Sequence, residues 1–285
     1  MISVLELGLV DYDAGLRLQR RLVELRKQQA VGDVLLFLEH PPIITLGRNA
    51  KAANVLASPD QLAQRGVEVF ECDRGGDVTF HGPGQLVGYP IFDLYNFASS
   101  APPGKRLGVI EYVRRVEEVL IRTCADFHIA GERVAGLTGV WTKEEPEAAG
   151  SADRAGRVGE PTAGRAPTED PPPPAKIAAI GVHISRGVTS HGFALNVNND
   201  LSFFDLIIPC GLASKPVTSM AARLHRPLAL DQVAHSLSRH FGQVFESQML
   251  WLDSLDALCG EAVGVPLITP AELRRVRGED DICRS

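Results

Sequence analysis

The spacing of apolar residues along the chain alternates between the period of a strand and the period of a helix. Near the N-terminus Leu5, Leu7 and Leu9 alternate with polar or small residues, which indicates a strand. From about residue 12 to residue 30 the apolar side chains recur every three or four positions, which predicts an amphipathic helix. The run DVLLFLE at 33–39 is typical of a buried strand. The N-terminal region therefore predicts a strand, a helix and a second strand.

The same two periods continue through the rest of the chain. Apolar residues at helical spacing predict two long helices, at 108–129 and 228–245. Cys124 falls on the apolar stripe of the first of these helices, so we expect it in the core. Shorter apolar runs predict strands at 67–72, 85–94, 175–185 and 188–197, and we expect the last two to be adjacent. This alternation is compatible with an α/β fold.

Two segments depart from this pattern. Residues 143–175 are rich in proline, glycine and charged residues, and Val158 is their only large aliphatic residue. Because this insert cannot bury enough apolar surface to offset its ordering entropy, we expect it to be disordered. Its four consecutive prolines, 171–174, predict a stiff extended approach to Lys176. The polar tail beyond residue 270 is expected to be peripheral.

Composition restricts the classes of protein to which the chain can belong. Its 285 residues are 45% hydrophobic, which is enough for one large or two modest domains with a real core. The net charge of -6 argues against general nucleic-acid binding. The N-terminus lacks the pattern of a secretory signal, and no apolar run is long enough to span a membrane. The five scattered cysteines form no CxxC pair. We therefore expect a cytoplasmic protein with reduced thiols and no membrane segment.

The first candidate for chemistry is the pair Cys210 and Lys176. Cys210 lies between a proline and a glycine, where it is either a nucleophile or a small residue under a turn. Lys176 opens an apolar strand, where its amine either reaches solvent or serves a partner. A lysine whose pKa is lowered by burial can take the proton of a thiol, and its ammonium then stabilises the thiolate. Such a pair can serve both halves of a two-step acyl transfer.

The second candidate is the glycine-rich stretch RGGDVTFHGPGQL at 74–86. It matches neither GxGxxG nor a phosphate-binding loop, so it is either a tight bend or the wall of a ligand site, with Arg74 and His81 as polar groups. His183 and His191 could face the same cleft if their strands pair. We expect no metal, because no short ligand spacing occurs, and no serine hydrolase, because GxSxG is absent.

Four stretches in order resemble the lipoyl(octanoyl) transferase family. They are LEHPPIITLGR (38–48), RGGDVTFHGPGQLVGYPIFDL (74–94), the run 175–212 and VTSM (217–220). The resemblance implies an α/β (α+β) fold with a mixed β-sheet flanked by helices. That fold is related to the biotin and lipoate protein ligase catalytic domain and carries a smaller C-terminal subdomain. We therefore expect a catalytic domain at 1–230 and a C-terminal helical subdomain with a polar tail at 231–285.

The resemblance also implies an activity. Members of the family transfer an octanoyl group from octanoyl-acyl carrier protein to a lysine of lipoyl-carrier domains, through a cysteine thioester, as the first step of endogenous protein lipoylation. The implied acceptors are apo lipoyl domains of 2-oxoacid dehydrogenase complexes and the glycine cleavage H protein. No cofactor is implied, because the acyl group arrives on the phosphopantetheine of the carrier.

The family's functional residues transfer to matching positions in this sequence. Cys210 stands where the family has its nucleophile, and Lys176 stands where it has the catalytic lysine. The implied substrate contacts are Arg74, Gly75, Gly76, Asp77, Val78, Thr79, Phe80, His81, Ala179, Ile180, Gly181, Gly192, Phe193 and Ala194. The insert at 143–175 is longer than the link expected in the family, and the part beyond about residue 226 resembles it weakly.

Two other functions stay open at this point. An ATP-dependent lipoate or biotin protein ligase shares the implied fold, but it forms an acyl-adenylate and needs no cysteine nucleophile. A non-catalytic binder of carrier proteins would keep Cys210 buried and inert. Detection of an acyl group on Cys210 separates the transferase from both.

Overall fold

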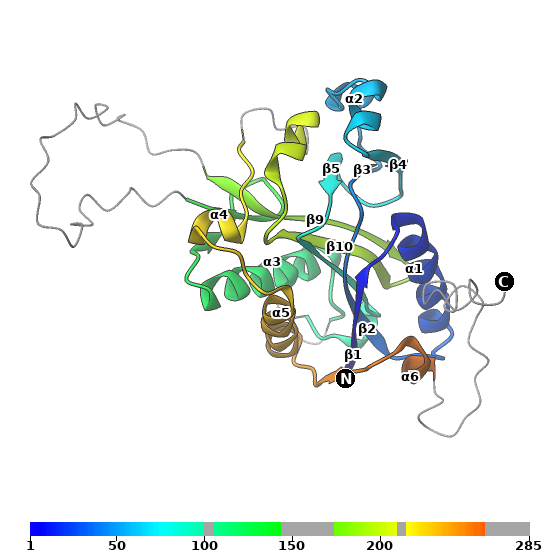
Figure 1. Cartoon of the computed structure of the whole chain (residues 1–285). Helices are drawn as coiled ribbons and strands as arrows, with labels where there is room; N and C mark the ends of the chain where they lie inside the picture. The colour runs from blue at the N-terminus through cyan, green and yellow to red at the C-terminus, as the bar shows by residue number, and fades with distance from the viewer. Residues whose placement is uncertain (100–104, 144–173, 210–214, 260–285) are drawn as a thin grey trace, which may run out of the picture.

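An eight-stranded mixed sheet forms the centre of the protein, seen in a computed structural model that describes residues 1–99, 105–143, 174–209 and 215–259 (Figure 1). Its strand order is β11-β1-β2-β6-β10-β9-β8-β7. β1 runs parallel to β2 and to β11, and the other neighbours are antiparallel. The strands are β1 (Ile2–Leu9), β2 (Asp33–Glu39), β6 (Gln85–Ile91), β7 (Gly131–Glu132), β8 (Val140–Thr142), β9 (Ala175–Ser185), β10 (Val188–Asn196) and β11 (Met249–Trp251).

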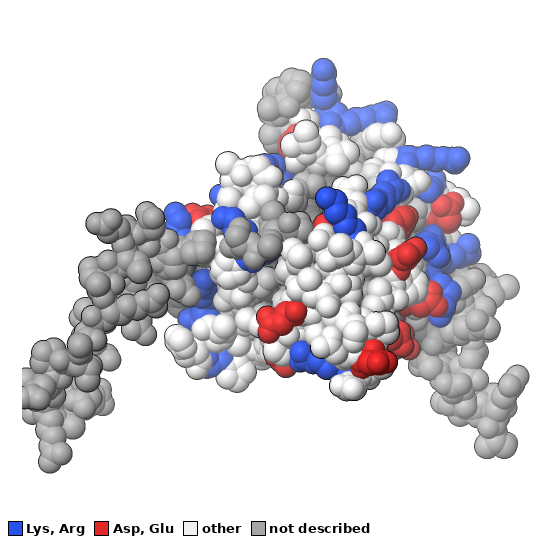
Figure 2. Space-filling model, turned by 90° about the horizontal axis from the view of Figure 1, so that it is seen from above, with Lys and Arg blue, Asp and Glu red and all other residues white. Residues whose placement is uncertain are grey.

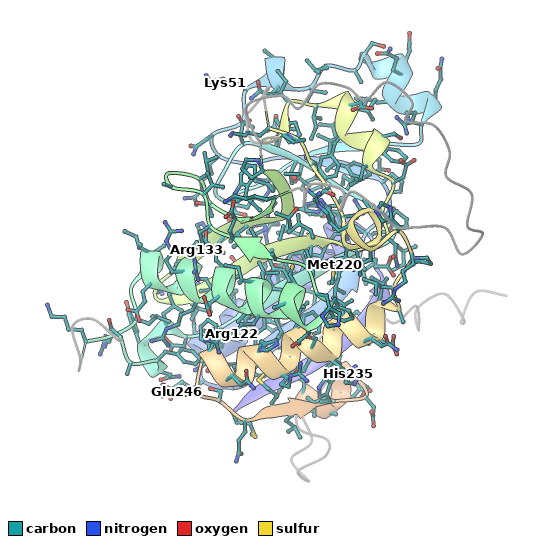
Figure 3. All side chains as sticks on the ribbon, turned by 90° about the vertical axis from the view of Figure 1, so that its left-hand side faces the viewer. Lys51, Arg122, Arg133, Met220, His235 and Glu246 are labelled. Carbon is teal, nitrogen blue, oxygen red and sulfur yellow. The ribbon has the colours of Figure 1, made fainter. Side chains whose placement is uncertain are left out.

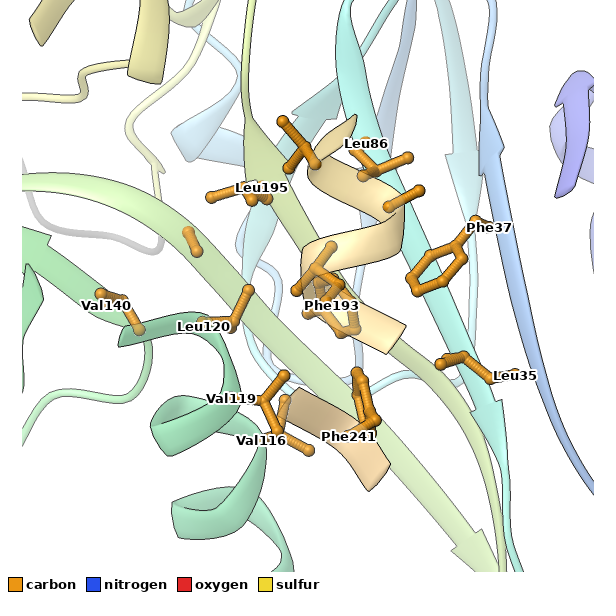
Figure 4. Packing of buried hydrophobic residues seen from close by; sticks show 14 of the residues in the cluster. Leu35, Phe37, Leu86, Val116, Val119, Leu120, Val140, Phe193, Leu195 and Phe241 are labelled. Carbon is orange, nitrogen blue, oxygen red and sulfur yellow. The ribbon is translucent and has the colours of Figure 1, made fainter. Parts of the chain in front are cut away.

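Helices cover both faces of this sheet, because its strands are apolar on both sides. In β2, Leu36 packs with α1 (Tyr12–Lys27), whereas Phe37 points to the opposite face and packs with α3 (Val109–Asp126) and α5 (Leu230–Val244). Figure 4 shows this second core, in which Phe193 and Phe241 lie between side chains of α3 and Phe37 of β2. The sheet is therefore the middle of three layers (Figure 1).

The layer made by α3 and α5 is held together at its surface as well as in its core. The carboxylate of Asp126 accepts hydrogen bonds from Ser236, Arg239 and His240 of α5, at 2.7 Å from His240. Figure 3 shows the two helices side by side, with Arg122 and His235 on their outer surface. Figure 2 shows the face seen from above, where side chains of both signs of charge lie close together on the right of the view.

A second, three-stranded sheet packs beside the large one, in the order β4-β3-β5. It consists of β3 (Ile43–Leu46), β4 (Glu68–Glu71) and β5 (Val78–His81), with the short helices η1 (Ala52–Asn54), α2 (Pro59–Gln64) and η3 (Leu201–Leu206). α2 begins at Ser58, which forms a reciprocal capping box with Gln61. This unit has a hydrophobic core of its own that includes Phe80, Phe204 and Ile207.

Most of the predicted elements are confirmed, with shorter ends. The helices predicted at 12–30, 108–129 and 228–245 span 12–27, 109–126 and 230–244, and the strand predicted at 85–94 ends at residue 91. Cys124 is fully buried in the core, as expected. The remaining short elements were not predicted, because two to six residues are too few to show a period. They include β5, β7, β8, β11, α2, η1, η3, η2 (Leu94–Asn96), α4 (Met220–Leu224) and α6 (Leu255–Cys259).

Some expectations concern residues outside the described ranges. Almost all of the 143–175 insert and the tail beyond residue 270 lie there. The domain boundary near residue 230 stays a prediction, although β11, beyond that boundary, pairs with β1 of the central sheet. Among the described residues no helix is both long enough and apolar enough to cross a membrane.

Gly88 offers a test of how tightly the central sheet is packed. It lies opposite Phe193, and a Cβ atom at Gly88 would come within 2.2 Å of the Phe193 ring. Gly88→Ala should therefore lower the free energy of unfolding by about 1–3 kcal/mol in urea titrations. Gly32→Ala is the matched control, because nothing lies within 4 Å of its added Cβ. Equal unfolding midpoints for the two variants would contradict this packing.

Candidate active site

A cavity of about 350 Å³ lies between the small sheet and the large sheet. Residues of β5 in the small sheet and of β6, β9 and β10 in the large sheet line it. This volume is within the usual range for small-molecule sites. Most residues implied by the resemblance line this cavity, although they come from three separate stretches of sequence. They are Arg74, Gly75, Gly76, Asp77, Thr79, His81, Lys176, Ala179, Ile180, Gly181, Gly192, Phe193 and Ala194.

Val78 and Phe80 are the described exceptions. Side chains of β5 alternate between its two faces, so Thr79 and His81 face the cavity while Val78 and Phe80 face the core of the small sheet. The Phe80 ring stacks on Phe203 with centroids 4.8 Å apart. Both side chains are core residues of the small sheet, and their expected contact with the substrate stays a prediction. Cys210 lies outside the described residues.

Several lining residues were not singled out from the sequence. Tyr12 comes from α1, Tyr89 from β6, and Leu137 and Thr138 from the loop before β8. Tyr12 stands at the start of a predicted helix, and nothing in its local sequence indicates a ligand site. Leu137 belongs to a loop with no periodic signal. Only their contacts across the fold reveal these residues as part of the cavity.

Arg74 places a buried positive charge in the cavity wall. Its Nη2 donates to the carbonyl oxygen of Thr45 at 2.7 Å and to Oγ1 of Thr45 at 2.9 Å, and its Nη1 donates to the carbonyl of Gly75 at 3.1 Å. All these acceptors are neutral, and within the described ranges no carboxylate forms an ion pair with Arg74. The guanidinium can therefore stabilise negative charge on a molecule in the cavity.

His81 faces the cavity as a neutral imidazole. Its Nδ1 lies 2.7 Å from Oε1 of Gln85, whose amide nitrogen donates to the carbonyl of Phe80 and to Asn196. Oε1 can only accept, so the His81 Nδ1–H donates to it. Burial lowers the pKa of His81 to about 3, with further contributions from His40 and Arg74. At neutral pH His81 therefore acts as a hydrogen-bonding group without charge.

A second neutral histidine supports the cavity from behind. Nδ1–H of His40 donates to the carbonyl of Val10 at 2.6 Å, so its Nε2 accepts from the Tyr89 hydroxyl at 2.7 Å. Burial lowers the pKa of His40 to about 4 and raises the pKa of Tyr89. The Tyr89 hydroxyl therefore stays protonated and keeps a fixed direction in the cavity wall.

His191 and Asp73 form a pair at the cavity edge. Nε2 of His191 donates to Oδ1 of Asp73 at 2.8 Å, and its backbone N–H donates to Gln19 at 2.7 Å. These contacts hold the backbone of His191 at a φ of 55°, a conformation that residues other than glycine rarely adopt within a strand. The expectation that a strand histidine faces the same cleft as His81 is confirmed for His191. It is wrong for His183, which is not part of the lining and bonds to Arg48 at 2.6 Å.

Lys176 lies in the cavity wall and is held there by backbone hydrogen bonds at the start of β9. Its backbone N–H donates to the carbonyl of Pro216 at 2.8 Å, and its carbonyl accepts from the N–H of Thr218 at 2.9 Å. Its ammonium lies over the Trp141 ring, 4.8 Å from the centroid. The side chain is buried and shares a small second pocket with Pro209 and Val217. The chain on both sides of residues 210–214 therefore approaches Lys176.

Metal binding has no support in the described part of the chain. Its His, Cys, Asp and Glu side chains form no group of three or more that could hold a metal ion.

Comparison with known proteins identifies the family. Residues 11–242 match the lipoyl protein ligase A/B catalytic domain. An octanoyltransferase of Koribacter versatilis is 54% identical over 282 residues, which cover 99% of this chain and 99% of that protein. An octanoyltransferase of Acidobacterium capsulatum is 54% identical over 256 residues, or 89% of this chain and 94% of the relative.

Solved structures confirm the expected fold as that of lipoate protein ligases. A lipoate-protein ligase A bound with ATP superposes with a TM-score of 0.60 at 15% identity, covering 99% of this chain and 95% of that chain. A bipartite lipoate protein ligase of Thermoplasma acidophilum gives a TM-score of 0.61 at 15% identity, covering 98% of this chain and 92% of that chain. At this identity the likeness concerns the fold alone. The high identity to the octanoyltransferases shows the family: the chain belongs to the lipoyl(octanoyl) transferase family of acyltransferases.

Proposed function

We propose that this protein transfers an octanoyl group from octanoyl-acyl carrier protein to a lysine of a lipoyl domain, with Cys210 as nucleophile and Lys176 as its acid–base partner. The observation that carries the proposal is that Pro209, which is bonded to Cys210, lines the same small pocket as buried Lys176. The octanoyltransferase relatives support octanoyl as the transferred group. The proposed acceptors are lipoyl domains of 2-oxoacid dehydrogenase complexes and the glycine cleavage H protein.

In the first half-reaction the Cys210 thiolate attacks the thioester carbonyl of the donor. The bond between the carbonyl carbon and the carrier sulfur breaks, and the Lys176 ammonium gives its proton to the departing thiolate. The enzyme now carries an octanoyl thioester on Cys210, and Lys176 is a neutral amine. The oxyanion that forms during attack is stabilised by backbone N–H groups of the glycine-rich segment 74–84.

In the second half-reaction the neutral amine of the acceptor lysine attacks the thioester on Cys210. Lys176 accepts the proton that the attacking nitrogen must lose, and the Cys210 thiolate is expelled. An amide has formed, and the thiolate and ammonium of the resting enzyme are restored. One lysine therefore serves as acid in the first half and as base in the second.

The cavity suits an acyl chain with a polar head. Its lining combines the apolar side chains of Val87, Leu137 and Ile180 with polar groups, among them Arg74 and His81. Burying the methylenes of an eight-carbon chain at roughly 0.8 kcal/mol each contributes about 5 kcal/mol to binding. The polar groups can orient the thioester at the head of the chain.

Intact-protein mass spectrometry after mixing with octanoyl-acyl carrier protein tests the proposal. We expect the wild-type protein to gain one octanoyl group without ATP, because a thioester donor needs no activation. Cys210→Ser should not accumulate the labile thioester. Cys72→Ser is the matched control and should be labelled like the wild type, because the Cys72 thiol is half-buried and donates to the carbonyl of Leu46.

Two outcomes would reject this function. An unmodified wild-type protein that lipoylates its acceptor only with ATP would indicate a ligase, which activates the acyl group as an adenylate. An unmodified protein that binds the carrier without any transfer would indicate a non-catalytic binder.

A further inference from the structure

The pairing of β8 with β9 contains a bulge next to Lys176. Val140 pairs with Ala178, but Trp141 pairs with Lys176, so Ile177 is an extra residue in β9. Without this extra residue Trp141 would lie opposite Ile177, and Thr142 would lie opposite Lys176. The bulge therefore brings Trp141 directly across from Lys176, where cross-strand side chains share one face of the sheet.

This register places the Lys176 ammonium over an aromatic face. Nζ lies 4.8 Å from the centroid of the Trp141 ring, within the range in which a cation is attracted by the ring quadrupole. Trp141 is fully buried, and Lys176 is 8% exposed. Because little water surrounds the contact, its effect on the ammonium is larger than at an exposed site.

The surroundings of Trp141 indicate that the face of its ring, and not its indole N–H, makes the contact that distinguishes tryptophan at this position. Its indole N–H is buried and has no hydrogen-bond partner among the described residues. Burying a polar group without a partner destabilises the fold, so phenylalanine would serve a purely structural role at lower cost. Tryptophan is, however, the side chain that attracts a cation most strongly.

The loop before β8 also lies close to Lys176, at Gly139. Gly139 has a φ of 115°, and a Cβ there would lie 2.5 Å from the carbonyl oxygen of Ala178 and 3.5 Å from Cε of Lys176. The backbone N–H of Gly139 donates to buried Glu117 at 3.1 Å. The Gly139 backbone therefore lies close to the aliphatic part of Lys176, and a side chain at this position would contact Cε.

We infer that Trp141 is a positioning residue for Lys176: the face of its indole stabilises the ammonium and so favours the thiolate of the catalytic pair. This inference rests on the function proposed above. Without the ring the neutral amine becomes more favourable, the lysine holds its proton less firmly, and a smaller fraction of the cysteine is thiolate at neutral pH.

Other ionisable groups also surround Lys176. Those that line its cavity are Tyr12, Arg74, Asp77, His81, Tyr89 and His191. Burial lowers the pKa of both histidines and raises the pKa of both tyrosines, so all four are neutral at pH 7. Glu117, which accepts a hydrogen bond from Gly139, is paired with Arg114 and Arg133. Lys215 directly precedes Pro216, whose carbonyl accepts from Lys176. The Trp141 variants leave every one of these charges in place.

Titration of Lys176 by NMR tests the inference directly. The chain has six lysines, so ¹³C-labelled lysine gives a short spectrum in which Lys176 is assigned from the Lys176→Met variant. In a Cys210→Ser background, Trp141→Leu should lower the pKa of Lys176 by about 0.5 to 1.5 units, and Trp141→Phe should lower it by less. An unchanged midpoint in both variants would overturn the inference.

Fluorinated tryptophan removes the question of whether these variants fold. The chain has two tryptophans, and successive fluorination weakens the negative face of the ring while changing its shape little. The pKa of Lys176 should fall stepwise with the number of fluorines. Fluorinated Trp141→Phe, which carries the label only at Trp251, is the matched control and should show no further fall. A pKa that does not respond to fluorination at Trp141 would reject the ring-face mechanism.

The two proposals fail in different experiments. If the wild-type protein forms no octanoyl thioester, the proposed function is wrong whatever Lys176 does. If the thioester forms but the pKa of Lys176 does not depend on Trp141, only the positioning role is wrong. A matching rise in the midpoint for alkylation of Cys210 in Trp141→Leu would connect the two results.

Discussion

Lys176→Met should lower kcat for octanoyl transfer by about 10²- to 10⁴-fold, the usual contribution of a positioned acid–base group. Methionine has a similar length and keeps the packing at the start of β9, but it can neither stabilise a thiolate nor exchange a proton. Both half-reactions should slow, because Lys176 is proposed as acid in one and as base in the other. Formation of the octanoyl thioester and its transfer to a lipoyl domain are measured separately by rapid quench and mass spectrometry.

Two further variants sharpen this test. Lys176→Arg keeps a positive charge that cannot be lost at ordinary pH, so it should form some thiolate yet fail to restore the second half-reaction. Lys143→Met, which changes an exposed lysine paired with Glu132, should transfer octanoyl at the wild-type rate. Activity of Lys176→Met within tenfold of wild type would remove this lysine from the mechanism.

Acid should destabilise the fold before its carboxylates are protonated. Burial depresses the pKa of His40 to about 4 and of His81 to about 3, and it lowers the pKa of His191 as well. Unfolding restores the ordinary value of about 6.5, so the unfolded chain binds more protons than the folded one below that pH. The stability from these neutral histidines is present above pH 6.5 and is lost as the pH falls towards 4.

The expected size of this loss is about 1.4 kcal/mol per pH unit for each histidine, or several kcal/mol between pH 6.5 and 4.5. Carboxylates with a lowered pKa, such as Asp73, Glu118 and Asp126, add to it only at lower pH, through the region where free carboxyls titrate. Urea unfolding at pH 7, 6 and 5 measures the slope above that region.

A pair of variants separates the histidine effect from general weakening. His40→Asn should be less stable than wild type at pH 7 but lose less stability per pH unit, because one titrating group is gone. Tyr89→Phe removes the hydroxyl that bonds to His40 and leaves its burial, so it should lower stability while keeping most of the slope. Equal slopes for wild type and His40→Asn would show that this histidine does not control the acid response.

The sequence alone determined the layered architecture and the catalytic pair to test. Apolar runs predicted β2, β9 and β10, and apolar residues at helical spacing predicted the three long helices, because burial restricts the residue types over many positions. The resemblance of four ordered stretches identified the family and pointed to Lys176 and Cys210. These features depend on local pattern or on residue types that the chemistry itself requires.

Tertiary structure decided which side chains meet in the cavity. Val78 and Phe80 belong to the implied ligand wall in sequence, yet the alternation of β5 turns them into the core. Tyr12 and Leu137 enter the cavity from a helix and a loop that carry no functional motif. One extra residue at Ile177 sets Trp141 opposite Lys176. A shift of one residue in a strand exchanges its two faces, and such registers arise from pairing between distant segments, which no local pattern records.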